Sequence, residues 1–395
     1  MNRPPVEALV SLGSPASSAP HVLHVFPSYA LGGVPIRFAT ILNHLGPRYR
    51  HTICALDGNH AASVRLDRAL HVRLIDPSID KRRPLASLLR IHGTLRHERP
   101  SLLVTHNWGA IEWALVRGLL RDRVPHVHCE SGFDSDESDR QLPRRVRLRR
   151  LALSGRSTLV VPSESLLRIA RDVWRIDRRR IRHIPNGVDC ERFGGLGNSS
   201  AATGFVPRPE ELVIGTVAPL RKVKNVGRLI RCFAKVAPRF PTARLLVVGE
   251  GVDRPALEQL AQELGVAERT HFTGHVERPQ DVYPLMNVFA LTSDTEQMPN
   301  TVLQAMAAGR AVASVDVGDV KSMLSIDNRR FVVARPDEDA HAETLAKLLD
   351  DAALRTRLGA ANRVHVRAHY GQSRMFSAYE DLFSSSIAPS GRLRR

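Results

Sequence analysis

The chain has 395 residues and carries 57 Lys and Arg against 40 Asp and Glu, which gives a formal net charge of +17. This length exceeds what one hydrophobic core supports and predicts about two or three domains. The composition, with 43% apolar and 25% charged residues, is that of a soluble globular protein. The sequence has no apolar run near the ~20 residues of a membrane span and no signal-peptide pattern, so we expect a cytoplasmic protein.

The first residues predict a leader and then the opening unit of an α/β domain. Residues 1–19 are rich in Pro, Ser and Ala, so we expect them to be disordered. A strand of buried type at 21–26, the turn at Gly32 and Gly33, and helical periodicity over 34–45 follow. Two glycines let a ligand phosphate approach a helix N-terminus closely, although a tight turn needs glycine equally often.

Strand and helix signals alternate through the rest of the amino-terminal half, and two of the strands, at 101–105 and 124–129, end in polar residues. These residues are His106 and Asn107 after the first strand, and Glu130 and Asp134 after the second. Ligands of open α/β sheets bind at the carboxyl ends of strands, which makes them candidate contacts, although a lone histidine is more often structural. The remaining signals are strands at 51–56, 72–75 and 159–163, an extended strand at 184–189 that breaks into an Asn-Gly turn, and helices at 85–96, 110–120 and 164–171.

A basic segment begins at Pro143, where arginines alternate with apolar residues as in a basic amphipathic helix. Its cations include Arg144, Arg145, Arg149 and Arg150. Such a helix either lies on anionic lipid headgroups, where each charge contributes about 1 kcal/mol, or forms the solvated flank of an ordinary domain. Aromatic content is only 5% and the basic segments lack interleaved aromatic residues, so we expect no nucleic-acid partner.

Residues 194–210 are rich in Gly, Asn, Ser, Ala and Pro and predict a linker before a second α/β series. Arg221 and Lys224 come just after a strand at 212–217, where two cations suit a diphosphate unless they are merely solvated. The turn at Gly251 is not part of a GxGxxG fingerprint, so a dinucleotide site has no support. Further signals are strands at 243–248, 271–272 and 331–333 and helices at 226–236, 255–264, 339–349 and 373–383.

The stretch after a strand at 288–291 holds the strongest candidate for a binding site. A polar loop with Glu296 leads into a helix at 299–308, which Pro299 suits at its start and Gly309 at its end. Free amides at that start would stabilise a phosphate, and Glu296 would accept hydrogen bonds from hydroxyls. The first turn and polar face comprise Met298, Pro299, Asn300, Thr301 and Gln304. An ordinary βα turn has the same pattern.

Cysteine and histidine spacings give no support for a metal site. The 4 cysteines are scattered without a CxxC pair, and the 17 histidines include no HExxH motif. We therefore expect neither disulfides nor a bound metal.

Five pieces in order and spacing resemble the retaining nucleotide-sugar glycosyltransferases of family 4, over about residues 21–385. They are Gly32-Gly33, the run Ile184-Pro-Asn-Gly-Val-Asp189, Lys224-Asn225, Gly249-Glu-Gly251, and Ser293-x-x-Glu296 followed by Gln304-Ala-Met-Ala-Ala-Gly309. The resemblance is closest to bacterial exopolysaccharide and lipopolysaccharide enzymes, which add a hexose to a glycan at the inner face of the cytoplasmic membrane.

The resemblance implies the GT-B fold, an α/β architecture of two Rossmann-like doubly wound domains that face an interdomain cleft. A carboxy-terminal helix would cross back to the first domain. The implied parts are an acceptor domain at 20–193, the linker at 194–210, a nucleotide-sugar domain at 211–370, the crossover helix at 371–386 and a disordered basic tail at 387–395.

The resemblance also implies the partners and the role of each site residue. The donor would be a UDP- or GDP-sugar, and the acceptor a glycan or a polyprenyl-diphosphate-linked glycan. No cofactor or metal is expected, because cations and a helix N-terminus take the charge of the leaving diphosphate. The implied catalytic residues are His106, Lys224 and Glu296. The implied donor contacts are Gly32, Gly33, Arg221, Lys224, Gly251, Glu296, Met298, Pro299, Asn300, Thr301 and Gln304, and the acceptor side comprises Asn107, Glu130 and Asp134.

Three positions depart from the family pattern. Gln304 stands where the family has a second glutamate for the ribose hydroxyls, so a charge-assisted hydrogen bond becomes a neutral one of roughly half the strength. Pro219 replaces an arginine, and Pro35 stands where a glutamate is common after the Gly-Gly pair. Two alternatives therefore stay open: a weakened protein that acts as a binding or scaffold subunit, and another GT-B enzyme such as a phosphorylase or epimerase.

Overall fold

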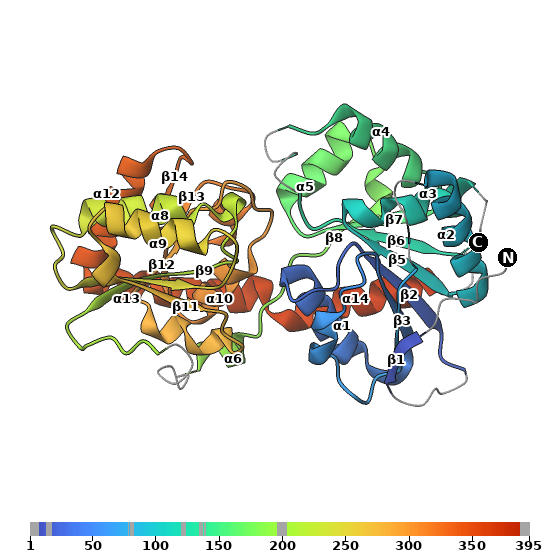
Figure 1. Cartoon of the computed structure of the whole chain (residues 1–395), viewed down its shortest axis with the longest axis horizontal. Coiled ribbons are helices and arrows are strands. Elements are labelled where there is room, and N and C mark those ends of the chain that lie inside the picture. The colour runs from blue at the N-terminus through green and yellow to red at the C-terminus, as the bar shows by residue number, and fades with distance from the viewer. Residues whose placement is uncertain are drawn as a thin grey trace. The chain divides into compact units, whose positions relative to one another are not determined.

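The computed structural model describes residues 18–77, 79, 83–119, 124–133, 137, 140–195 and 204–387, together with the backbone of a strand at Ala8–Leu12. The chain divides into two compact units (Figure 1). The amino-terminal unit comprises Met1–Ile184 and Met375–Arg395, and the carboxy-terminal unit comprises Pro185–Arg374. Within the described ranges, no helix is long and apolar enough to cross a membrane.

The described part of the amino-terminal unit contains an eight-stranded sheet in the order β1-β4-β3-β2-β5-β6-β7-β8. All neighbours are parallel except β1, which is antiparallel to β4. The central strands are almost entirely buried, as expected of a parallel sheet covered on both faces. The strands are β1 Ala8–Leu12, β2 His21–Phe26, β3 Arg50–Ala55, β4 Val72–Ile75, β5 Leu102–His106, β6 His126–Cys129, β7 Ser157–Val161 and β8 Ile181–His183.

The carboxy-terminal helix α14 completes the core of the amino-terminal unit. Its apolar residues pack with Phe26 and Phe38, and the rings of Tyr379 and Phe38 meet edge to face at 5.5 Å. This contact confirms the predicted return of the last helix to the first domain. The helices of this unit are α1 Gly33–Leu45, α2 Pro84–Glu98, α3 Ile111–Leu119, α4 Pro143–Ala152, α5 Glu164–Arg168 and α14 Gln372–Ile387.

The carboxy-terminal unit has a parallel sheet, in the order β11-β10-β9-β12-β13-β14 among the described residues. Val213 and Ile214 of β9 enter different core clusters, because alternate residues of a strand face opposite sides. Helices therefore cover both faces. The strands are β9 Leu212–Val217, β10 Ala243–Val248, β11 Thr270–Gly274, β12 Val288–Leu291, β13 Ala311–Val315 and β14 Val332–Val333. The helices are α6 Cys190–Gly194, α8 Val226–Val236, α9 Arg254–Glu263, α10 Asn300–Ala307, α11 Val320–Met323, α12 Glu338–Asp350 and α13 Ala352–Tyr370.

Each sheet has a point where the chain changes its winding direction. In the first sheet β2 lies between β3 and β5, and in the second β9 lies between β10 and β12. Loops that leave the carboxyl ends of such a strand pair diverge and leave a crevice in which ligands of doubly wound folds bind. The loops in question follow β2 and β5 in one unit, and β9 and β12 in the other.

Several boundaries differ from the sequence-based expectations. Strand β1 lies inside the predicted disordered leader, and 184–189 is not a strand, because β8 ends at His183. The unit boundary at Ile184 precedes the predicted linker, of which 196–203 lie outside the described residues. Helix α13 was not predicted, because its buried face includes a glycine where an apolar side chain would be expected. This residue is Gly359, and a Cβ there would lie 2.0 Å from Gly309 O. Of the predicted basic tail, only Ile387 is described, and it is helical.

Candidate functional site

Two loops meet at the switch point of the carboxy-terminal unit. The loop 218–225 follows β9, and the loop 292–299 follows β12, its parallel neighbour. Lys224 Nζ lies 2.6 Å from Glu296 Oε1, so the predicted cation and carboxylate are brought together. Ser293 Oγ donates to the same oxygen at 2.9 Å. The two charged side chains are only 19% and 12% exposed, so solvent screens this pair less than an ordinary surface ion pair.

Helix α10 begins directly after this pair. It spans Asn300–Ala307, within one residue of the predicted bounds at each end, and Gly309 follows with φ of +67°. Its N-cap, Pro299, makes no side-chain capping hydrogen bond, so the first turn offers backbone amides with partial positive charge. Met298 is 7% exposed and Thr301 is half-buried. The Asn300 Oδ1 atom is buried with no hydrogen-bond partner in the described part of the chain.

Gln304 turns its side-chain oxygen toward the core of the unit. The hydroxyl of Tyr283 donates to Gln304 Oε1 at 2.7 Å. Burial raises the pKa of Tyr283 well above its usual value, so that hydroxyl keeps its proton. One of the two lone pairs expected to serve a ribose hydroxyl is therefore already in use, and a glutamate at this position could accept the same bond.

The Gly249–Gly251 turn packs directly against the loop that carries Lys224. A Cβ on Gly249 would lie 1.9 Å from Ala218 O, and one on Gly251 would lie 2.2 Å from Leu220 O. Leu220 N donates to Glu250 O at 3.0 Å. Close backbone approach thus accounts for both glycines, and the structure gives Gly251 a supporting position beside the Lys224 loop.

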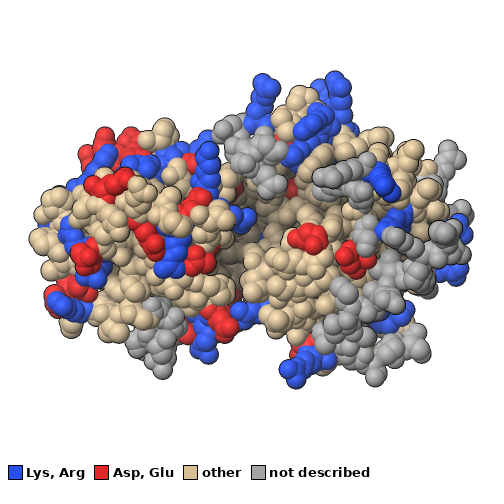
Figure 2. Space-filling model, in the orientation of Figure 1, with Lys and Arg blue, Asp and Glu red and all other residues tan. Residues whose placement is uncertain are grey.

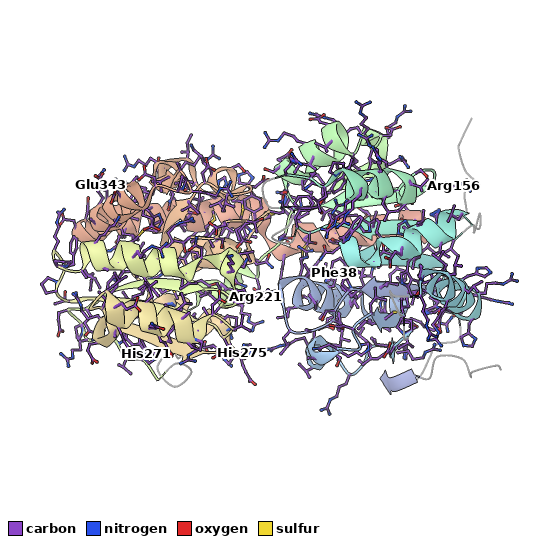
Figure 3. The ribbon with its side chains drawn as sticks, turned by 45° about the horizontal axis from the view of Figure 1, so that its top comes forward. Phe38, Arg156, Arg221, His271, His275 and Glu343 are labelled. Atoms are coloured by element: carbon purple, nitrogen blue, oxygen red, sulfur yellow. The ribbon has the colours of Figure 1, made fainter. Side chains whose placement is uncertain are left out.

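Arg221 is not brought to the Lys224–Glu296 pair. Its side chain is exposed and lines a pocket of about 420 Å³ formed with α8 and α9 (Figure 3). The pocket walls include Asn225, Leu257 and Leu260. Arg221 begins the short helical turn 222–224, which separates it from Lys224.

A residue that sequence reasoning missed supports Met298. Asn186 Nδ2 donates to Met298 O at 2.9 Å, and the Asn186 amide approaches Met298 Sδ at 3.2 Å. Both residues are buried. The sequence predicts an extended strand that breaks into an Asn-Gly turn here, and it places Asn186 in the 184–189 run of the family resemblance without assigning it this role.

In the amino-terminal unit, Gly32 and Gly33 form the start of α1. Gly32 is the N-cap with extended backbone, φ of −169°, and its nearest heavy-atom neighbours for a Cβ lie 3.9 and 4.0 Å away. A side chain would therefore fit at Gly32 without strain. Neither Gly32 nor Gly33 has a positive φ, so the backbone at these two positions does not require glycine.

His106, predicted as a catalytic residue, lies among core residues of the amino-terminal unit. Its ring is fully buried, parallel to Phe26 at 3.7 Å and edge to face with Phe38 of α1 at 4.2 Å. Neither ring nitrogen has a hydrogen-bond partner among the described residues. Burial holds the pKa of His106 well below its usual value. The last residue of β5 points to the face that α1 covers, and its catalytic role stays a prediction.

Asn107 joins the loops after β5 and β6. It has φ of +56°, a conformation that few side chains adopt, and its Oδ1 accepts from Ser131 N at 2.9 Å. Ser131 Oγ in turn accepts from Arg37 of α1 at 2.7 Å. Asn107 is half-buried and stays at the edge of the sheet where an acceptor was predicted.

Glu130, predicted as an acceptor contact, is fully enclosed in the amino-terminal unit. Its carboxylate lies 3.5 Å from Arg149 Nε and 3.6 Å from His128 Nε2. A carboxylate without exposed surface orders the loop after β6 rather than touching a substrate. Asp134, the other acceptor candidate, lies outside the described residues.

Arg149 is equally buried, and so it is not part of a membrane-facing surface. It is 1% exposed, donates to both oxygens of Glu137 at 3.0 and 2.9 Å, and stacks over Trp108 and Trp174 at 4.8 and 4.7 Å. Burial would raise the pKa of Glu137, but hydrogen bonds from Arg149 and Arg145 lower it. Arg145 is partly withdrawn into the same cluster, whereas Arg144 and Arg150 remain exposed.

No metal cluster is formed by the part of the chain that the structure describes. No group of three or more His, Cys, Asp or Glu there could hold a metal ion, and the cysteines are free thiols.

Comparisons with known proteins match both units. A family model described as Glycosyltransferase Family 4 matches residues 31–192, and one described as Glycosyl transferases group 1 matches residues 204–365. EpsF of Bacillus subtilis, named as a glycosyltransferase, is 26% identical over 373 residues, covering 85% of this chain and 94% of that protein. The lipopolysaccharide core biosynthesis glycosyltransferase LpsD of Rhizobium meliloti is 24% identical over 291 residues, covering 62% and 83%.

The fold is likewise found in solved structures. HepE of Anabaena, in complex with UDP-glucose, superposes with a TM-score of 0.76 at 16% sequence identity. The match covers 92% of this chain and 99% of that one.

Proposed function

The chain belongs to the family 4 glycosyltransferases, and we propose that it moves a hexose from a UDP- or GDP-sugar to a glycan or polyprenyl-diphosphate-linked glycan of a bacterial surface polysaccharide. The observation that carries this proposal is the Lys224–Glu296 pair at the start of α10. It combines a cation, a hydroxyl acceptor and uncapped helix amides at one switch point, which is what a diphosphate-linked sugar requires. The names of EpsF and LpsD and the UDP-glucose bound to HepE support the same substrate class.

In this proposal Lys224 and the amides at the start of α10 bind the diphosphate and stabilise the charge that it gains on leaving. Glu296 accepts hydrogen bonds from the sugar hydroxyls and sets the orientation of the ring. The bond between the anomeric carbon and the diphosphate oxygen breaks while the acceptor oxygen attacks on the same face. The acceptor proton passes to the departing diphosphate, and the configuration is retained.

The leading glycines of α1 suit a phosphate contact made by the amino-terminal unit on its own account. Since neither conformation nor packing demands a glycine at Gly32, its missing side chain leaves the start of α1 open to close approach by a ligand. His106, which is enclosed by Phe26 and Phe38, takes no direct part in this proposal.

We also propose that helix α4 attaches the protein to an anionic membrane surface. Lys and Arg side chains stand out over the α4 region of the amino-terminal unit (Figure 2). Arg144, Arg147 and Leu151 are exposed on α4, and Leu151 is 56% exposed. Exposed arginines around an apolar side chain suit peripheral attachment to anionic headgroups, where a lipid-linked acceptor would be found.

A donor screen with the purified protein tests the proposed function. Hydrolysis of UDP- and GDP-hexoses is followed by release of nucleoside diphosphate, with and without a chelator, and binding of UDP, GDP and ADP is measured by calorimetry. We expect one nucleotide to bind and one donor to turn over, with the chelator having no effect. Absence of both turnover and nucleotide binding would leave the scaffold alternative standing. Phosphate-dependent glycan cleavage would favour a phosphorylase.

A further inference from the structure

We propose that Asp294 is a positioning residue of the donor site, an inference that rests on the proposed function. Asp294 stands between Ser293 and Glu296 in the loop after β12 but points to the other loop of the site. Its two carboxylate oxygens accept from Asn225 Nδ2 at 3.2 and 3.0 Å. Its backbone amide donates to Val223 O at 2.9 Å. Asp294 therefore holds the residues on both sides of Lys224.

Asn225 carries this constraint to the backbone of Lys224. It adopts the left-handed conformation, with φ of 43° and ψ of 48°. Its Oδ1 accepts from Arg228 N at 3.2 Å and so caps α8, while its carbonyl accepts from Thr292 Oγ1 at 3.0 Å. With its amide group on Asp294 and its oxygen on the helix, the Asn225 side chain is held at both ends. A residue fixed in this way immediately after Lys224 sets the direction in which the lysine leaves the chain.

Arg228 adds a second connection between the same elements. Its guanidinium donates to Asp294 Oδ1 at 2.8 Å and to the carbonyl of Thr292 at 2.8 Å. The Arg228 side chain is 11% exposed, and so its charge needs the carboxylate close by. The first turn of α8 is thereby joined twice to the loop that carries Glu296.

This network lies at the edge of the unit and not in its hydrophobic core. Helix α8 is anchored independently by Leu229, Ile230 and Phe233, which are fully buried. The Asp294 side chain, by contrast, is 40% exposed. Removing its carboxylate should therefore loosen the two loops and leave Arg228 without this close partner, at some cost in stability, while the hydrophobic core of the unit stays folded. The distance between Lys224 and Glu296 would then no longer be fixed.

A double-mutant cycle on nucleotide affinity tests the proposal. The variants are Asp294→Ala, Lys224→Ala and the double variant, with UDP and GDP as the probes in calorimetry. We expect Asp294→Ala to weaken binding about 10-fold in the wild-type background but less than about 3-fold when Lys224 is already absent. A residue that only stabilised the fold would give equal factors in both backgrounds. Equal factors, or unchanged affinity in Asp294→Ala, would overturn the proposal.

Two further variants serve as controls for the double-mutant cycle. Asp350→Ala removes an exposed carboxylate of the same unit, paired with Arg239 at 2.8 Å, and should leave affinity unchanged. Asp294→Asn keeps one side-chain oxygen as an acceptor, so its loss of affinity should be smaller than that of Asp294→Ala. An affinity equal to wild type in both variants would refute the inference. If wild-type protein binds no nucleotide, the proposed function itself fails, which is distinct from a wild type that binds and an Asp294 variant that binds equally.

Discussion

Lys224 Nζ contacts Glu296 Oε1 at 2.6 Å, so the cation and the carboxylate assigned to a donor sugar form an ion pair with each other. Ser293 donates to the same carboxylate oxygen. A diphosphate must compete with Glu296 for Lys224, while the sugar hydroxyls offer Glu296 new partners. The pair is electrically balanced, and each partner should affect nucleotide affinity and turnover differently.

Changing Glu296→Gln should separate binding from turnover. The neutral amide leaves Lys224 free for phosphate, so we expect UDP or GDP to bind about 3- to 10-fold more tightly. Donor turnover should fall about 100-fold, because the sugar loses a charged acceptor. Calorimetry and a donor-hydrolysis assay measure the two effects. Glu343→Gln changes an exposed carboxylate on α12 (Figure 3) and should alter neither nucleotide affinity nor turnover. Weaker nucleotide binding in Glu296→Gln would show that Glu296 does not compete with the diphosphate for Lys224.

Changing Gln304→Glu should strengthen binding of a nucleoside diphosphate about 2- to 5-fold, because an ionised oxygen makes a stronger bond to a ribose hydroxyl. The Tyr283 hydroxyl can still donate to the new side chain. Comparison with the free base and with the corresponding 2′-deoxy nucleotide would locate the gain at the ribose. No change for the ribonucleotide would speak against a ribose contact at this position.

The amino-terminal unit should lose stability in mild acid. Burial lowers the pKa of His24, His106 and His126 well below 6.5 and that of His51 to about 3. These rings stay neutral when folded, whereas the unfolded chain takes up protons below pH 6.5. The stabilisation is therefore complete above that pH and is lost as pH falls toward the folded pKa values, by up to about 1.4 kcal/mol per histidine and pH unit.

Urea unfolding between pH 7.5 and 4.5 measures this loss. His106→Phe replaces a ring that already stacks on Phe26, and it should reduce the pH dependence by one histidine's share. A free energy of unfolding that does not change between pH 7.5 and 5 would show that these histidines do not control acid stability.

Changing Arg144 and Arg147 together to alanine should weaken binding to vesicles containing anionic lipid by about 2 kcal/mol in total. Both side chains are exposed on α4. Co-sedimentation with anionic and with neutral vesicles measures the effect, and neutral vesicles provide the control. Unchanged binding would mean that the helix is simply solvated.

Arg149→Ala is expected instead to destabilise the protein, because Glu130 and Glu137 would lose a buried partner.

Much of the fold follows from local patterns. The bounds of β2, β9, β10 and β12 agree with the sequence prediction, because parallel strands covered on both faces are continuous apolar runs that end at polar loops. Pro299 and Gly309 mark the ends of α10 within one residue. Helix α13 escaped prediction since its buried face holds Gly359 and Asn362, whose fit depends on Gly309 and Asn328 from elsewhere in the chain.

The sequence by itself determined the fold class, the family and the Lys224–Glu296 candidate, since spacing and chain order are local or sequential properties. Only the tertiary structure decided which of the polar candidates are buried. His106, Glu130 and Arg149 had the residue types and positions of a functional site, yet all three are buried. The direction of a side chain at a strand or helix end depends on the elements that cover it, here α1 over His106 and the Trp108–Trp174 rings around Arg149. Such packing joins residues distant in sequence, and no local pattern contains it.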